Sequence, residues 1–155
     1  MTTNKNLLSP NKFRVIISKF PNLEIFAQAC VIPGINLGIV PQYTNEKYDL
    51  WIPGDKLTFD DLIISCIIDE DLTAYNQLKT WAYDISISEN KRQQYSDIDC
   101  IVGTNNSNPN KIFRFYNSFP YLIPSFAMDT RTTEDDVLSL DILFKISNFD
   151  LLDVI

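Results

Sequence analysis

Apolar and polar residues alternate along much of this chain, and this period of two constrains its fold more than any other feature. The clearest case is Val137–Ile146, where every second residue is apolar: Leu138, Leu140, Ile142, Phe144 and Ile146. Successive side chains of a strand point to opposite faces, so the spacing predicts a strand with one face on a core. The same pattern predicts strands at Lys12–Lys19, Glu24–Ile32, Leu62–Ile68, Tyr48–Ile52, Asp97–Val102, Lys111–Tyr116 and Ile123–Asp129.

One segment has the period of a helix instead. A helix is predicted from about Leu72 to Tyr83, because its apolar residues form one stripe at three-to-four spacing: Leu72, Tyr75, Leu78 and Trp81. We expect this stripe, Trp81 above all, to pack into the core. The acidic residues Asp69–Asp71 precede it and suit the positive end of a helix dipole. The pattern as a whole predicts a mainly β (α+β) fold: one antiparallel β-barrel or sandwich of about seven or eight strands with one flanking helix.

Composition excludes several classes of function. The 155 residues are enough for about one domain, so residues 1–155 are expected to form a single unit. A net charge of −7 opposes a docked complex with nucleic acid. The chain has no histidine, which removes His-based catalysis and His-ligated zinc, and its four glycines cannot build a phosphate-binding loop. No signal peptide or membrane span is recognisable, so we expect cytoplasmic synthesis and no membrane association.

Neither the cysteines nor the acidic clusters predict a chemical centre. Cys30, Cys66 and Cys100 are far apart in sequence and lie in apolar runs, which is typical of buried thiols in a reducing cell. Asp60 and Asp61 are adjacent on a strand and so point to opposite faces. We expect no catalytic residue, no metal site and no cofactor. A small monomeric β-barrel binding module or a carboxylate-dependent hydrolase stays open as an alternative class.

Residues 34–48 are predicted to form an extended loop between two strands. Long loops in compact domains are often functional, and this one is too apolar for a solvated linker. We expect it to meet another subunit, with the contacts made by Ile35, Leu37, Ile39, Val40 and Tyr43. The alternative is that the loop folds back on its own core.

The order of several short motifs resembles the tail-tube protein family of contractile-tailed bacteriophages. The resemblance extends from about Asn11 to Asp150. It rests on the segments Asn11–Val15, Gln28–Ile35, Ile52–Phe59, Ile68–Leu72 ahead of the Trp-bearing helix, and Phe119-Pro120 before a closing alternating strand.

The resemblance implies a structural role rather than an enzymatic one. Family members form hexameric rings that stack into a channel for DNA, and the loop after the second strand, here Ile35–Glu46, reaches the neighbouring ring. It implies a tail-tube subunit of the virion, assembled in the host cytoplasm, or alternatively a ring protein that initiates or terminates the tube. The implied partners are further copies of the chain, the tail sheath, the baseplate hub and the tape-measure protein, with DNA only as passing cargo.

An acidic channel would repel phosphate and let DNA slide, which fits the net charge of the chain. Polar faces of the predicted strands supply the candidate channel-facing residues. These are Lys12, Arg14, Glu24, Gln28, Asp97 and Asp99.

Overall fold

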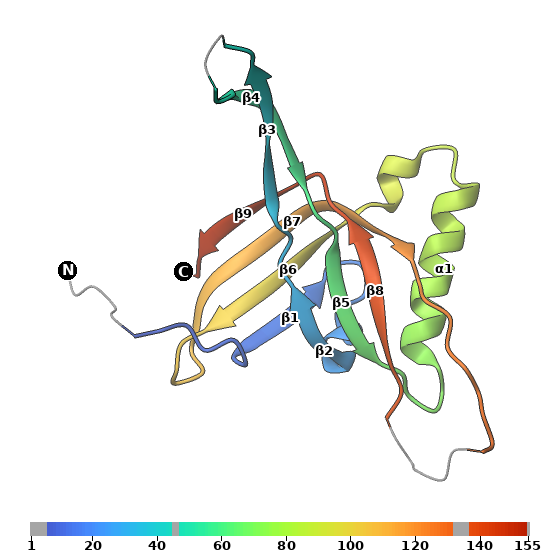
Figure 1. Ribbon diagram of the computed structural model, residues 1–155. Helices are drawn as coiled ribbons and strands as arrows, with labels where there is room; N and C mark the ends of the chain where they lie inside the picture. The colour runs from blue at the N-terminus through green and yellow to red at the C-terminus, as the bar shows by residue number, and fades with distance from the viewer. Residues whose placement is uncertain (1–5, 45–46, 132–136, 155) are drawn as a thin grey trace.

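The computed structural model describes residues 6–44, 47–131 and 137–154 (Figure 1). These residues form nine strands, one α-helix and two short 3-10 helices, so the fold is mainly β as the alternation predicts. The strands are β1 (Phe13–Ile17), β2 (Ala27–Val31), β3 (Ile35–Gln42), β4 (Leu50–Phe59), β5 (Leu62–Ile67), β6 (Ser96–Gly103), β7 (Pro109–Leu122), β8 (Ser139–Lys145) and β9 (Asn148–Asp153). The helices are η1 (Pro21–Phe26), α1 (Thr73–Ile87) and η2 (Lys91–Gln94).

Two antiparallel sheets share the long strand β7. Its first half pairs with β6 and β9, which with β1 makes a four-stranded sheet in the order β1-β6-β7-β9. Its second half pairs with β8, and the second sheet continues through β5 to β2. The strand bends between these halves at Asn117, whose φ of 53° is one that asparagine tolerates better than most residues. The described strands do not close a barrel, so the sandwich alternative holds.

The inward faces of both sheets meet in one apolar core. Residues directly opposite one another share a face, so Val15, Cys100 and Phe113 lie in one inward row of the four-stranded sheet. The alternating residues Leu140, Ile142 and Phe144 are buried on β8, as predicted. Other fully or almost fully buried side chains in this cluster are Ile17, Leu62, Ile64, Cys66, Ile98 and Phe115.

The cysteines also face this core and carry free thiols. Burial raises the pKa of Cys66 to about 11. A side-chain hydrogen bond with Cys100 raises the pKa of Cys30, which is packed against the same cluster from β2. Because the thiolate is the reactive form, the raised pKa values of Cys30 and Cys66 make those two thiols poor nucleophiles.

Helix α1 flanks the core beside β8, on the opposite side of the molecule from β9 (Figure 1). Leu78 and Trp81 are fully buried. The ring of Tyr75 is partly buried, and its centroid lies 5.4 Å from that of the Phe126 ring. Leu72 differs from the expected stripe: it precedes the helix in a left-handed conformation and is 42% exposed. The Asp69 carboxylate accepts a hydrogen bond from the Thr73 N–H at 2.9 Å and so stabilises the first turn.

Three local predictions were wrong. The loop predicted at residues 34–48 is replaced over Ile35–Gln42 by strand β3, which pairs with β4 in a two-stranded sheet of its own, and residues 45 and 46 lie outside the described part of the chain. The strand predicted at Glu24–Ile32 begins only at Ala27, since the segment after Pro21 forms the 3-10 helix η1. Ile123–Asp129 follows β7 as an extended connection without sheet partners. Within the described residues, no helix has the length and apolar content to span a bilayer.

Candidate assembly surfaces

The β3–β4 hairpin projects from the body of the sandwich and is the most prominent feature of the molecule (Figure 1). Its strands pair from Ile35 opposite Phe59 to Gln42 opposite Leu50. Phe59 joins it to the body, because its ring meets the ring of Phe149 on β9 edge to face at 5.4 Å. Beyond this contact the hairpin is in solvent, so its strands have no core of their own to pack against.

Large apolar side chains cover the hairpin and are exposed in the single chain. Side chains in β3 are 50–62% exposed at Ile35, Leu37, Ile39 and Val40. The facing strand adds Leu50, Trp51, Ile52 and Leu57 at 40–58%, and Tyr43 and Tyr48 near the turn are exposed by 86% and 80%. Contiguous apolar surface of this kind is typical of a protein interface.

Two glycines produce a bulge halfway along the hairpin. Leu37 lies opposite Leu57 but Ile39 lies opposite Pro53, so the register shifts at Gly38. A Cβ atom built on Gly54 would lie 3.0 Å from the carbonyl oxygen of Gly38. The close approach of the two backbones therefore requires glycine at position 54.

Two aspartates hold the base of the hairpin. Asp60 accepts a hydrogen bond from the Asn36 side chain at 2.9 Å, and its own N–H donates to the Gly34 carbonyl at 3.0 Å. Asp61 accepts from Lys145 Nζ at 2.7 Å and from the Tyr121 hydroxyl. These hydrogen bonds, from Lys145 above all, lower the pKa of Asp61. Both carboxylates therefore act as tethers within the chain.

The outward face of the four-stranded sheet is charged. Rows of paired residues place Ile16, Asp99, Arg114 and Asp150 side by side across its four strands. Arg114 binds Asp99 through two nitrogens at 2.9 and 3.2 Å, and this pairing raises the pKa of Arg114. Arg14 donates to Glu24 at 2.6 Å, which raises the pKa of Arg14 in the same way.

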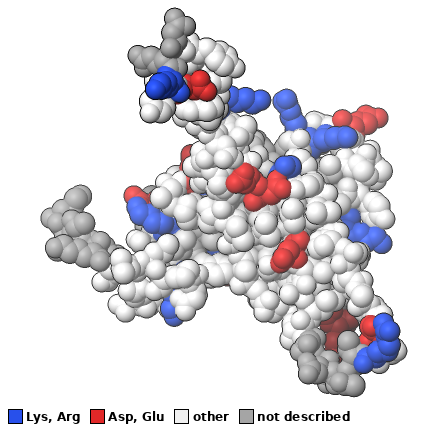
Figure 2. Space-filling view, in the orientation of Figure 1, with Lys and Arg blue, Asp and Glu red and all other residues white. Residues whose placement is uncertain are grey.

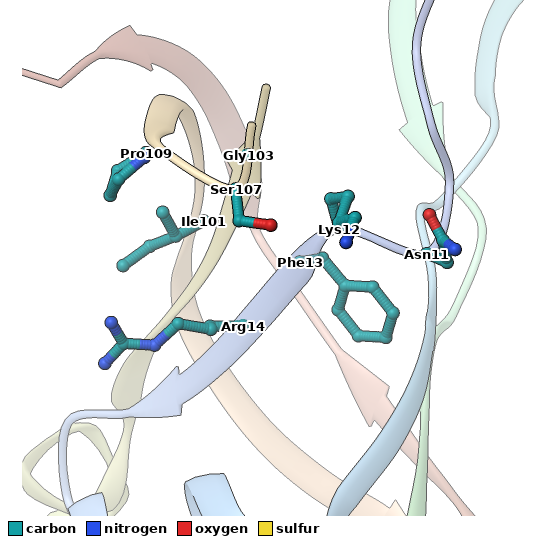
Figure 3. Close-up of a pocket in the computed structure, with 8 residues that line it drawn as sticks. All are labelled: Asn11, Lys12, Phe13, Arg14, Ile101, Gly103, Ser107 and Pro109. Carbon is teal, nitrogen blue, oxygen red and sulfur yellow. The ribbon is translucent and has the colours of Figure 1, made fainter. Parts of the chain in front are cut away.

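A shallow hollow of about 200 Å³ lies at one end of this face (Figure 3). Lys12 and Arg14 line it together with Ile101, Gly103 and Pro109. Arg14 and Ile101 point to the same side, while the ring of Phe13 points to the other (Figure 3). Sites for small molecules usually enclose about 300–1,000 Å³, so the hollow is small for such a ligand. Across the described residues, no group of three Cys, Asp or Glu side chains is arranged to hold a metal ion.

The structure brings most of the predicted candidate residues onto two surfaces. Ile35, Leu37, Ile39, Val40 and Tyr43 all lie on the hairpin. Arg14, Asp97 and Asp99 share the outward face of the four-stranded sheet, with Glu24 bound to Arg14 and Lys12 beside it. Gln28 lies apart from them, on β2 of the other sheet.

Sequence reasoning missed the residues that complete these surfaces. On the hairpin they are Leu50, Ile52 and Leu57, next to Trp51, for which the sequence leaves open a place at a subunit interface or in the core, and on the sheet they are Arg114 and Asp150. The uninterrupted run Leu50-Trp51-Ile52 was a signal, because a strand with one solvated face would alternate.

The whole chain is similar to chains of contractile injection systems. A chain of the sheath-tube complex of the PVC extracellular contractile injection system superposes with a TM-score of 0.73 at 15% identity, covering 97% of this chain and 94% of that one. A chain of the anti-feeding prophage baseplate superposes with a TM-score of 0.72 at 12% sequence identity, covering 97% of this chain and 97% of that one. A chain of the PVC sheath/tube terminator superposes with a TM-score of 0.72 at 14% sequence identity, covering 96% of this chain and 99% of that one.

No protein-family model and no curated protein sequence matches the chain. At 12–15% identity the structural likeness establishes the fold alone. The chain has the tail-tube type of fold found in contractile, phage-like injection systems.

Proposed function

We propose that this chain is a structural subunit of the tube of a contractile tail or tail-like injection system. The observation that carries the proposal is the exposed apolar hairpin on a sandwich of tail-tube fold. Isolated subunits would expose this surface to water, whereas stacking one ring on the next buries it. The hairpin thus makes the contact between rings that the sequence resemblance implies for this segment.

Rings form through the free edges of the four-stranded sheet. β1 pairs only with β6, and β9 only with β7, among the described strands. Neighbouring strands in this sheet run antiparallel, so β9 of one subunit meets β1 of the next in antiparallel orientation. Pairing of two different edges is a heterologous contact, and such contacts close into rings. We expect six subunits in each ring, as in the family that the sequence resembles.

The outward face of the four-stranded sheet lines the channel of such a ring. It carries Lys12, Arg14 and Arg114 against the carboxylates of Glu24, Asp97, Asp99 and Asp150, so three positive groups face four negative ones and the net charge of this set is −1. A face with excess negative charge suits a channel through which DNA passes without adhering. DNA is therefore cargo of the tube and not a bound ligand.

The remaining partners follow from the same position in the particle: the sheath around the tube, the baseplate hub at one end and the tape-measure protein inside. The chain belongs in the virion tail, or in a tail-like particle, after assembly in the producing cell's cytoplasm. A second candidate is a ring that begins or ends the tube, which the equal likeness to a terminator assembly favours.

Electron microscopy and sizing of the purified chain test the proposal. A repeating tube subunit grows into long tubes, while a terminating or initiating protein stops at single rings. A particle that stays near 17.8 kDa at all concentrations would contradict both and favour a monomeric binding module or hydrolase.

A further inference from the structure

Two of the three cysteines meet inside the sandwich, one from each sheet. Cys30 lies on β2, the last strand of the second sheet, and Cys100 lies on β6 of the four-stranded sheet. Cys30 pairs with the fully buried Ile64, and Cys100 pairs with Val15 on β1, a strand that also packs against β2. Both side chains belong to the same core cluster, and their sulfur atoms are in hydrogen-bond contact. Two thiols far apart in sequence therefore touch across the core.

The third cysteine is different. Cys66 is buried in the same core, on β5, but burial alone accounts for its raised pKa, with no contribution from another thiol. The thiol contact therefore belongs to Cys30 and Cys100, and Cys66 is a natural comparison within the same chain.

We propose that Cys30 and Cys100 form an oxidation site, at which hydrogen peroxide closes a disulfide between the two sheets. A disulfide needs Cβ atoms about 4 Å apart, and thiols already in contact require little movement to reach this geometry. A reducing cytoplasm keeps both thiols free, so the bond forms after the chain has left the producing cell. The site is a property of the single subunit and does not depend on the tube role.

The reaction consumes one molecule of peroxide. The Cys30 S–H donates to the sulfur of Cys100, which lowers the pKa of Cys100 and favours its thiolate. This thiolate attacks a peroxide oxygen, the O–O bond breaks and hydroxide leaves, so that Cys100 becomes a sulfenic acid. The Cys30 sulfur then attacks the sulfenic sulfur, the S–O bond breaks, and the hydroxyl leaves as water with the Cys30 proton. Together the two thiols lose two electrons and two protons, and the peroxide becomes two water molecules.

Burial selects a small, uncharged oxidant. Cys100 is only 3% exposed, and Cys30 is partly buried. Figure 2 shows mostly uncharged surface with isolated carboxylates over β2 and β5, so this side of the molecule does not attract anions. Oxidised glutathione is bulky and anionic and is excluded from the core, whereas hydrogen peroxide is little larger than water.

Peptide mapping of the full chain tests the site. The reduced protein is treated with hydrogen peroxide, unfolded in the presence of iodoacetamide, and digested without a reducing agent. Cys30→Ala and Cys100→Ala each remove one partner. Cys66→Ala is the matched control, because it removes a buried thiol and leaves the pair intact. Thermal unfolding before peroxide treatment shows which variants are folded, and the wild-type map decides alone where a variant is not.

The wild type and Cys66→Ala should yield one linked peptide pair, joined between Cys30 and Cys100. The free thiols of the wild type should fall from three to one. The linked chain should unfold roughly 10 °C higher, because the bond restricts the unfolded state, and reduction should reverse the shift. Neither the link nor the shift should occur in Cys30→Ala or Cys100→Ala.

Three results would overturn the inference: three free thiols after peroxide, a link that involves Cys66, or links only between separate chains. Ring and tube formation are measured on the reduced chain, so failure of the oxidation site leaves the proposed function standing.

Discussion

Trp81 connects three parts of the molecule through one side chain. Its ring is fully buried and meets Phe20 at 5.8 Å and Phe144 at 6.0 Å, so it joins α1 to the β1–η1 turn and to β8. Its indole N–H donates to the carbonyl oxygen of Gln94 at 2.6 Å. Both the packing and the hydrogen bond depend on tryptophan at this position.

Replacing Trp81 separates these two contributions. Trp81→Ala should lower the free energy of unfolding by about 3–5 kcal/mol, because it removes the largest side chain of the core. Trp81→Phe should cost less, about 1–3 kcal/mol, since it leaves the Gln94 carbonyl without its donor. Urea unfolding of the soluble variants measures both values. An Ala variant as stable as the wild type would contradict the role of Trp81 as a core anchor.

The cluster of Asp61, Lys145 and Tyr121 predicts a pH effect with a definite sign. The folded-state pKa of Asp61 is lowered, so its stabilisation is present above the unfolded pKa of about 3.9 and is lost as the pH falls through the folded value. Lys145→Met should lower stability only slightly at pH 6, because solvent screens this exposed pair. The difference from the wild type should shrink as the pH falls below the unfolded pKa and vanish once Asp61 is protonated in the folded state. A difference independent of pH would show that Lys145 acts through packing on Tyr121 instead.

At the scale of elements, the hairpin needs glycine because its two backbones approach too closely for a Cβ atom, and not because a glycine has an unusual backbone angle. None of the described glycines has a positive φ. A Cβ on Gly54 would lie 3.0 Å from the carbonyl oxygen of Gly38, whereas a Cβ on Gly38 would meet its nearest atom, the carbonyl oxygen of Lys56, at 3.4 Å.

Gly54→Ala should therefore distort the hairpin, because a backbone carbonyl cannot move aside as a flexible side chain can. We expect the variant to keep the unfolding temperature of the body and to stack at a higher concentration than the wild type. Gly38→Ala is the matched control and should stack more nearly like the wild type. If the two variants stack at the same concentration, the close approach at Gly54 does not determine the direction in which the hairpin projects.

The strands that sequence reasoning found and missed differ in what stabilises them. Alternation located β5, β6 and β8 because each has one face on the core. It missed β3 because a two-stranded ribbon without a core need not alternate apolar and polar residues. Gly38 and Pro41, which are uncommon inside strands, weaken the pattern further. Its formation depends on pairing with β4, a non-local contact that no local pattern contains. The five apolar candidates at Ile35–Tyr43 could be selected from composition, but Leu50, Ile52 and Leu57 on β4 could not.

At the scale of the whole molecule, the charge of the sheet face can be tested in assembled tubes. Asp97→Lys with Asp150→Lys turns two negative side chains of this face positive. If the face lines the channel, these tubes should bind short DNA at low salt, release it as salt rises, and protect it from nuclease. Wild-type tubes should bind none. Binding of DNA that stays sensitive to nuclease would place the face on the outside of the tube.

The central claim is that this fold assembles by joining the free edges of its four-stranded sheet and by burying its hairpin between rings. Cryo-electron microscopy of assemblies grown from the purified chain tests it most directly. The account predicts closed rings in which β9 of one subunit lies beside β1 of the next, with the hairpin seated on the neighbouring ring. Subunits that remain monomeric, or rings in which both edges and the hairpin stay in solvent, would contradict it.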